Sequence, residues 1–223
     1  MNSPTAFLLI ASIAFVGTHF LMSHPLRDPM VRAMGEGPFR GVYSLVSLVT
    51  FGAMIYAYRA IGRETPFWDP GDLIWLVGSI LMWLASILFV GSFAGNPGLV
   101  GARRPSGGPK GVLGITRHPM MWSFALWALV HCAVVATPKA MILDAAIFIL
   151  AVFGSVGQDA KKRKLMGEAW HVWSAKTAFI PFSKGLANPG VVALIGGTLL
   201  FVAATWAHGA IGGMPAGFWR WIG

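Results

Sequence analysis

The sequence predicts an all-α protein, a polytopic membrane helical bundle of about six transmembrane helices with its N-terminus outside. Three observations predict it: composition, long uncharged runs, and an uneven distribution of Lys and Arg. Hydrophobic residues make up 56% of the chain and charged residues 11%, and the mean hydropathy is +0.66. Soluble domains carry about 25% charged residues. This composition therefore excludes a water-soluble enzyme.

Uncharged runs predict the first three spans, because about 20 apolar residues cross a hydrocarbon core. The 26 residues before Arg27 carry no charge. Because this segment has no basic residue at its start, we expect a retained first helix and not a cleaved signal peptide. The 18 residues between Arg40 and Arg59 and the 30 between Asp72 and Arg103 predict the second and third spans.

The second half of the chain predicts three more spans. Uncharged runs of 21 residues between Arg117 and Lys139 and of 35 residues between Lys184 and Arg220 hold one span each. A further apolar stretch, near 140–158, carries only Asp144. The six predicted spans lie near residues 5–22, 41–58, 72–94, 118–137, 140–158 and 189–209, and form one integral membrane domain over residues 1–223.

The distribution of basic residues predicts the orientation. Of the 17 Lys and Arg, 13 fall in the loops after the first, third and fifth spans, and 4 fall in the other loops and the C-terminal tail. The positive-inside rule then places both termini outside. The net charge of +9 belongs mainly to a cytoplasmic rim that faces anionic lipid. Membrane lipid is therefore an expected partner, and nucleic acid is not.

Two loops differ from plain connectors. Residues 95–117 hold seven glycines between Gly95 and Gly114, and this segment either turns or binds a ligand. Residues 159–188 form a basic segment with interleaved tryptophans. They predict an interfacial helix whose Trp170 and Trp173 dip into the membrane.

The histidines are the residues most able to carry chemistry. His19 and His131 fall inside predicted spans, where a titratable side chain is a functional candidate by default. The alternative is that each forms an interhelical hydrogen bond. His24, His171 and His208 fall near interfaces and need no special explanation. His118 and His131 are separated by about 220° around one helix, so they do not easily share a pocket.

Haem b suits two membrane histidines better than zinc does, because two imidazoles can fill both axial positions of the iron. No zinc spacing or CxxCH motif occurs, and Cys132 is the single cysteine. Trp127 and Ala128 share the face of His131 and could flank a flat cofactor. Arg103 and Arg104 could pair with haem propionates or with lipid phosphate. One difficulty is depth, since His19 falls about 21 Å from the outer start of its helix and His131 about 9 Å from the outer end of its own.

Three segments together resemble the NnrU family of bacterial membrane proteins, whose plant-type relative is zeta-carotene isomerase. They are THFLMSHPLR, GEGPFRGVYSLVSL and GVLGITRHPMMWSFALWALVH, in family order across the first five spans. The resemblance implies a multi-pass protein of the bacterial inner (cytoplasmic) membrane. It also implies a b-type haem and cis–trans isomerisation of a polyene or carotenoid, or else a role linked to nitrite and nitric oxide reduction in denitrification.

Carried over by position, the resemblance implies that His19 and His131 are the catalytic axial ligands of the haem iron, and that His118 is not. A lipophilic small molecule is the implied substrate. The isomerase branch has a cysteine three residues before the second histidine, where this chain has Ala128.

Two alternatives remain open. RHPMMWSFALWA and GEAWHVWSAKTAFIP also resemble the isoprenylcysteine and phospholipid methyltransferases. In that interpretation Arg117, His118 and the glycine-rich loop would hold S-adenosylmethionine, with Asp159 as the acidic residue. The other alternative is a non-enzymatic membrane assembly factor.

Overall fold

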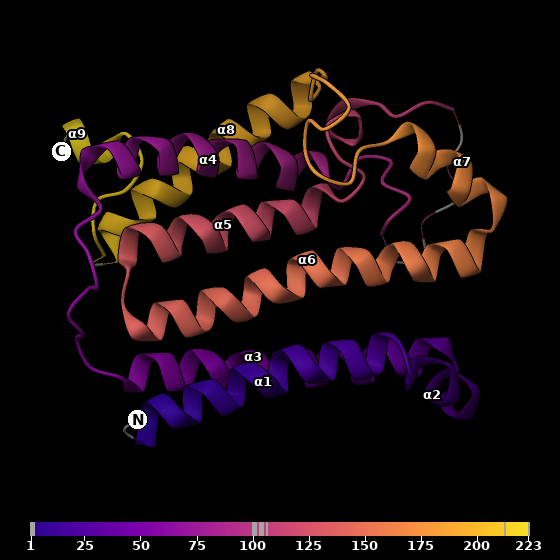
Figure 1. The fold of residues 1–223 in the computed structure, drawn as a ribbon, viewed down its shortest axis with the longest axis horizontal. Coiled ribbons are helices and arrows are strands. Elements are labelled where there is room, and N and C mark those ends of the chain that lie inside the picture. The colour runs from indigo at the N-terminus through magenta and orange to yellow at the C-terminus, as the bar shows by residue number, and fades with distance from the viewer. Residues whose placement is uncertain (1–2, 100–101, 103–104, 106, 212, 223) are drawn as a thin grey trace.

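The protein is all-helical, as the sequence predicts. The computed structural model describes residues 3–99, 102, 105, 107–211 and 213–222, and none of these lies in a strand. The helices are α1 (Ser3–Ser23), α2 (Arg27–Met34), α3 (Glu36–Ala60), α4 (Gly71–Gly91), the 3-10 helix η1 (Gly111–Gly114), α5 (Pro119–Val135), α6 (Pro138–Met166), α7 (Glu168–Lys176), α8 (Val191–Ala210) and α9 (Trp219–Ile222) (Figure 1).

A helix stands at each predicted span. Among the described residues, α1, α3, α4, α6 and α8 are long and apolar enough to cross a membrane, while α5 is apolar but has 17 residues. At 1.5 Å per residue α5 is about 26 Å long, a little less than the hydrocarbon core. The structure thus supports five to six spans.

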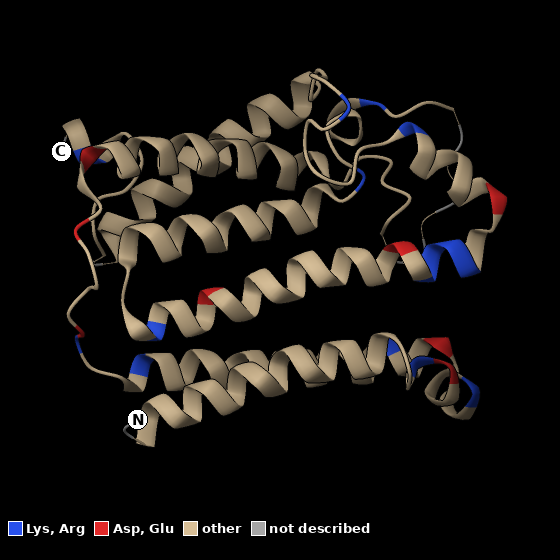
Figure 2. Ribbon diagram, in the orientation of Figure 1, with Lys and Arg blue, Asp and Glu red and all other residues tan. Residues whose placement is uncertain are grey.

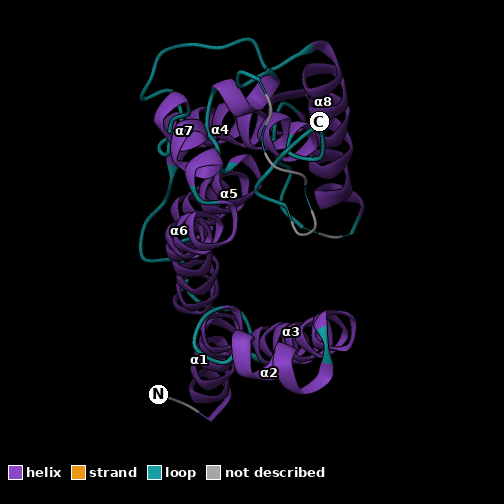
Figure 3. Ribbon diagram, turned by 90° about the vertical axis from the view of Figure 1, so that its right-hand side faces the viewer, coloured by secondary structure: helices purple, strands orange, loops and turns teal. Residues whose placement is uncertain are grey.

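The long helices form a curved row in the order α3, α1, α6, α5, α4 and α8, each packed against the next (Figure 3). Helix α6 packs against both α1 and α5 and so connects the two halves of the row. One cluster of buried side chains joins α1, α3 and α6 around Leu8, Met54 and Leu143. A second joins α4, η1 and α8 around Leu88, Val112 and Ala193.

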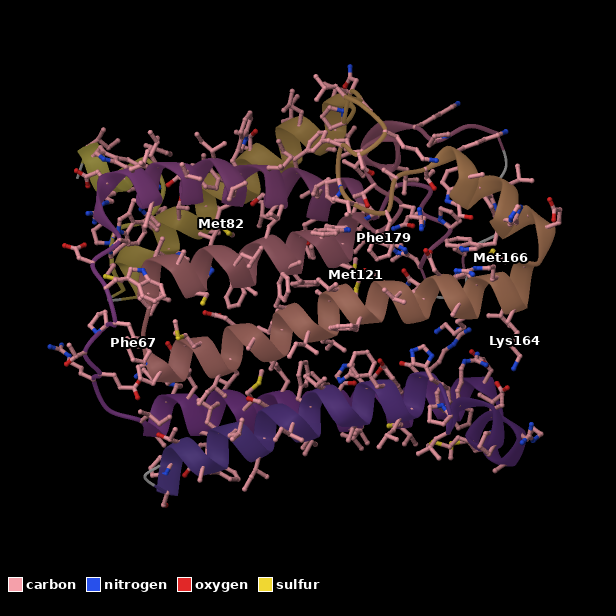
Figure 4. The ribbon with its side chains drawn as sticks, viewed as in Figure 1. Phe67, Met82, Met121, Lys164, Met166 and Phe179 are labelled. Carbon is pink, nitrogen blue, oxygen red and sulfur yellow. The ribbon has the colours of Figure 1, made fainter. Side chains whose placement is uncertain are left out.

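Both termini lie at one end of the row, here called the terminal end (Figure 1). The opposite end carries α2, α7 and the last turns of α6, and most of the described basic residues gather there (Figure 2), so we call it the basic end. Lys164 reaches from α6 towards α2 (Figure 4), where it pairs with Asp28 at 2.9 Å. This hydrogen bond lowers the pKa of Asp28. The positive-inside rule would place the basic end in the cytoplasm, and this orientation stays a prediction.

The last helix before the basic loop is longer than expected. The sequence predicts a span over 140–158, but α6 continues to Met166. Lys and Arg are good helix formers and are favoured near a helix C-terminus. The helix ends at Gly167, whose φ of 57° suits a residue without a side chain.

The prediction for the two tryptophans was wrong. Trp170 is 0% exposed and Trp173 is 5% exposed. They pack with Leu113 of η1, and Met166 lies against them. Helix α7 turns back after Gly167 and covers η1, so these rings fill a protein core where membrane contact was expected.

Helix α8 packs closely against the backbone of α4 at Gly197. A Cβ added there would lie 2.5 Å from the Cα of Ile87 and 2.7 Å from its backbone nitrogen. Small residues permit such contacts between membrane helices. We therefore expect Gly197→Ala to push α8 away from α4 and to lower the free energy of unfolding by about 1–3 kcal/mol, measured as thermal unfolding in detergent.

The matched control is Gly209→Ala in the same helix, where an added Cβ has nothing within 4 Å. Since Ala is the better helix former, this variant should keep or slightly raise the melting temperature. Equal melting temperatures for the two variants would contradict the close α4–α8 contact.

Candidate functional site

A cavity of about 410 Å³ lies between α4, α5 and α8, and its lining runs along α5 from Ser123 to Val135 at the terminal end. Large apolar side chains dominate its walls, among them Met82 of α4 (labelled in Figure 4), Phe124 of α5 and Phe201 of α8. The segment 214–217 contributes Met214. Cofactor pockets usually have volumes of about 300–1,000 Å³ and few polar groups. The cavity is thus of a size for a cofactor or an apolar substrate.

The hydroxyl groups in the cavity wall already donate hydrogen bonds to carbonyl oxygens of their own helices. Ser79 donates to the carbonyl of Trp75, Ser86 to that of Met82, and Thr205 to that of Phe201, at 2.7–2.9 Å. Such local bonds satisfy a hydroxyl without water. The lining therefore presents little that would hold a water cluster.

Two histidines face this cavity, His131 from α5 and His208 from α8. Their ring centres are 6.3 Å apart. In each ring Nδ1 lies against the carbonyl oxygen four residues earlier, at 2.8 Å from Trp127 O and 2.7 Å from Ala204 O. A carbonyl only accepts, so Nδ1 must carry the proton, and Nε2 keeps its lone pair. Within the described residues neither Nε2 has a hydrogen-bond partner.

This arrangement is the one that metal-bound histidines use. A ligating imidazole commonly donates its second N–H to a carbonyl, which fixes the tautomer and the ring orientation. Among the described residues there is no group of three or more His, Cys, Asp or Glu side chains that could hold a metal ion. Within the described residues the two rings therefore lack the further side-chain ligands of an all-protein metal site.

The predicted wall beside His131 is present in part. The ring of Trp127 stacks on that of His131, with centres 4.0 Å apart and planes inclined by 26°, and Trp127 lines the cavity. Ala128 is 1% exposed and does not belong to the cavity lining. Arg103 and Arg104, predicted as propionate partners, lie outside the described residues.

The other predicted ligand, His19, sits elsewhere in the row. Its Nδ1 donates to Phe15 O at 2.7 Å, and its ring contacts Tyr43 of α3, with centres 5.4 Å apart. His19 lies about 24 Å along α1 from the terminal end, whereas His131 is about 6 Å from that end of α5. The pairing of His19 with His131 stays a prediction.

A second polar cluster occupies the basic end, where α5 begins. Arg117 makes a bidentate pair with Asp159 of α6, at 2.6–3.1 Å, and donates Nη1 to Thr177 O at 3.0 Å. Its guanidinium lies 5.2 Å from the ring centre of Phe179, which Figure 4 labels beside the start of α5. Arg117 thus ties α5, α6 and the segment after α7 together.

His118 completes this cluster with its side chain fully buried. Nδ1 lies 2.9 Å from Gln158 Oε1 and Nε2 lies 2.8 Å from Asp159 Oδ1. Both neighbouring atoms are oxygens of α6 side chains. Every side-chain nitrogen of Arg117 and His118 therefore has an acceptor inside the protein, and the cluster acts as an internal brace.

The start of the glycine-rich loop is held by two α6 side chains. Lys162 donates Nζ to Pro97 O at 2.7 Å and to Leu99 O at 2.9 Å, and Gln158 donates Nε2 to Gly98 O at 2.8 Å. The described start of this loop is thus a turn fastened to α6.

His208 is the residue that sequence reasoning passed over. It was expected to be an ordinary interfacial histidine, yet it lies in the same cavity as His131. The sequence held one signal for this placement. His131 and His208 each lie within two turns of the C-terminal end of their helix, so the two side chains lie at a similar depth in the membrane. By contrast, His171 is exposed, with 72% of its side chain accessible.

Comparison with known proteins gives one family and two relatives. The family described as NnrU protein matches residues 7–216. The chain is 23% identical to the chloroplastic 15-cis-zeta-carotene isomerase of Zea mays over 191 residues, 82% of this chain and 51% of that protein. The corresponding Arabidopsis thaliana protein is 24% identical over the same shares. The chain thus spans about half the length of these relatives. No solved structure matches.

Proposed function

Because the chain belongs to the NnrU protein family, we propose that this multi-pass membrane protein is a haem-dependent cis–trans isomerase of an apolar polyene. The proposal extends the activity named for the two plant relatives to this chain. The observation that carries it is the apolar cavity of about 410 Å³ into which His131 presents an unpartnered nitrogen.

The residues around the cavity fit a b-type haem. His131 is held in the ligating tautomer by Trp127 O, and the indole of Trp127 provides a flat neighbour for the imidazole. A histidine of another helix would provide a second ligand. A haem bound there would supply a redox-active iron with an exchangeable axial position.

The rest of the chemistry belongs to the protein. The walls from α4, α5 and α8 would enclose the cofactor and exclude water, because their hydroxyls are bonded to the backbone. A dry, apolar enclosure strengthens electrostatic interactions between the iron and a polarisable π-system. The apolar side chains at the cavity mouth would meet the polyene, and no acid or base at the double bond is required for a rotation.

The test is isomerisation by the purified protein. The chain, expressed with haem supplied and purified in detergent, is reduced and incubated with 15-cis-zeta-carotene, and the isomers are separated by chromatography. We expect conversion of the cis isomer by the reduced protein and none by the oxidised protein. His171→Ala, which changes an exposed histidine, should behave like the unchanged protein.

Two results would contradict the proposal. A protein that holds no haem under these conditions cannot work in this way. A haem-loaded, reduced protein that leaves the polyene unchanged is no isomerase of this substrate class, and nitric oxide binding to its iron would then be measured, in line with the denitrification-linked role of the family.

A further inference from the structure

We infer that an anionic phospholipid binds between α1 and α6 at the basic end, with an acyl chain in an apolar groove and its phosphate at Lys161. This site is separate from the cavity between α4, α5 and α8, and it does not depend on haem. Three observations carry the inference: the groove itself, an ammonium group at its end, and the pairing of the charges around that group.

The apolar part of the site is a groove of about 510 Å³ where α1 packs against α6, here called the α1–α6 groove. Phe20 and Leu21 line it from α1, and Phe153 and Val156 line it from α6. Of these side chains, Leu21, Phe153 and Val156 are 51–59% exposed. Inside a membrane such side chains meet hydrocarbon, and attraction there comes from packing contacts. An acyl chain parallel to the two helices would make such contacts with both.

The α1–α6 groove reaches a cation at its basic end. His24 lines the groove and lies against α6, because a Cβ added at Gly157 would collide with the His24 ring. Burial and the nearby positive charge of Lys161 lower the pKa of His24. Lys161 follows Gly157 by four residues, so it lies on the same side of α6, about 6 Å closer to the basic end. An apolar length that ends in a positive charge matches a lipid with an anionic headgroup.

Lys161 differs from the two other lysines of this helix end in having no partner in the described part of the chain. Lys162 donates to two carbonyl oxygens of the glycine-rich loop, and Lys164 pairs with Asp28. Lys161 is half-buried, yet it makes no hydrogen bond or ion pair among the described residues. A charge that is partly removed from water is stabilised by pairing, so an anion from outside the chain would stabilise Lys161.

The carboxylate near Lys161 is already occupied. Arg27 and Glu36 both lie within electrostatic range of Lys161. Arg27 donates Nη2 to both oxygens of Glu36 at 2.9 Å, and Arg40 reaches one of these oxygens at 3.2 Å. The Arg27 side chain is only 19% exposed, so two like charges lie near each other with little water between them. A phosphate would relieve this repulsion and would offer several acceptor oxygens.

The place of the site in the membrane selects the kind of anion. Most of the described basic residues gather at this end (Figure 2), and the positive-inside rule would place it in the cytoplasm. The cytoplasmic leaflet carries anionic lipids, and basic pockets between helices on that side bind their headgroups. A soluble anion would leave the α1–α6 groove empty, and the choline of phosphatidylcholine would compete with Lys161 for the phosphate. An anionic phospholipid uses both parts of the site.

The experiment measures thermal unfolding of the full chain, washed free of copurified lipid in detergent, as phosphatidylglycerol is added at about 0.15 M salt. We expect a saturable rise in melting temperature, and little rise with phosphatidylcholine or inorganic phosphate. Lys161→Ala should weaken the apparent affinity for phosphatidylglycerol about tenfold, because a charge-assisted contact is lost. Lys161→Arg should keep it within about twofold. The matched control Arg163→Ala removes an exposed cation two residues away and should also stay within about twofold.

A second variant tests the groove and leaves every cation in place. Val156→Trp fills part of the α1–α6 groove and should weaken the apparent affinity about threefold or more, because the acyl chain loses packing contacts. The melting temperature of each variant without lipid is its own baseline, which separates a loss of fold from a loss of binding.

Four results would overturn the inference. The first is the absence of a saturable rise with phosphatidylglycerol. The second is an equal loss of affinity in Lys161→Ala and Arg163→Ala, which would show diffuse attraction to the basic end. The third is an equal rise with phosphatidylcholine or with inorganic phosphate, because the first needs no cation and the second needs no groove. The fourth is an unchanged affinity in Val156→Trp.

Discussion

Replacement of His131 by Ala should remove haem from the purified protein. Under the proposed function His131 is the haem ligand, because the sequence resemblance nominates it and it lines the cavity. A b-type haem has no covalent attachment to hold it when a ligand is lost. Removal of groups that merely support a metal ligand lowers affinity about 10–100-fold. Loss of the ligand itself should weaken haem binding by about a hundredfold or more, measured by titration with the pyridine assay.

His118→Ala provides the contrast, because His118 lies at the basic end with both ring nitrogens bonded to Gln158 and Asp159. This variant should be less stable and should still carry haem. Full haem content in His131→Ala would show that the cavity is not the haem site. Haem loss in a well-folded His118→Ala would place the cofactor near the basic end.

Asp159→Asn should produce the largest loss of stability. The carboxylate accepts from Arg117 and His118 in a site where the Arg117 and Asp159 side chains are 13% and 7% exposed. Removal of one partner of a buried ion pair leaves an uncompensated charge and lowers the free energy of unfolding by about 3–5 kcal/mol. In a chain of this size, that corresponds to a fall of about 10 °C in melting temperature, measured by thermal unfolding in detergent.

The control is Asp28→Asn, which removes an exposed pair made with the same helix. Lys164 and Asp28 are 76% and 50% exposed, and surface pairs contribute little. Asp28→Asn should leave the melting temperature almost unchanged. Comparable shifts in the two variants would mean that the Arg117–Asp159 pair is solvated and braces nothing.

The two ends of the bundle thus have different physical characters. At the basic end, buried charged groups pair with one another, and these pairs link α5, α6 and the neighbouring loops. At the terminal end, an apolar cavity contains histidine nitrogens with no partner. Unused polar atoms in apolar surroundings are costly to maintain, and this is why we propose the cavity as the ligand site.

Much of the architecture could be predicted from local sequence. The fourth span illustrates this, because Pro119 at the start of α5 satisfies the preference for proline in the first helical turn, and Lys139 closes the uncharged run. Helix formation and membrane insertion depend on neighbouring residues and on hydropathy, and both are readable along the chain. The end of α6 was less predictable, since basic residues extend a helix beyond the membrane as readily as they end a span.

Packing between distant segments could not be predicted in the same way. The segment around Trp170 and Trp173 has the composition of an interfacial helix. Only the packing of α7 against η1 buries these two rings inside the protein. His208 resembles an interfacial histidine in sequence, and only the approach of α8 to α4 places it 6.3 Å from His131.

The sequence by itself determined that this chain is a helical membrane protein, where its apolar helices lie, and which family it resembles. The tertiary structure alone decided which histidines face each other and which charges neutralise each other. The physical reason is separation along the chain. Hydropathy and helix propensity act within about 20 neighbouring residues. A cavity or a buried ion pair instead depends on segments far apart in the sequence, such as Arg117 and Asp159, which are separated by 42 positions.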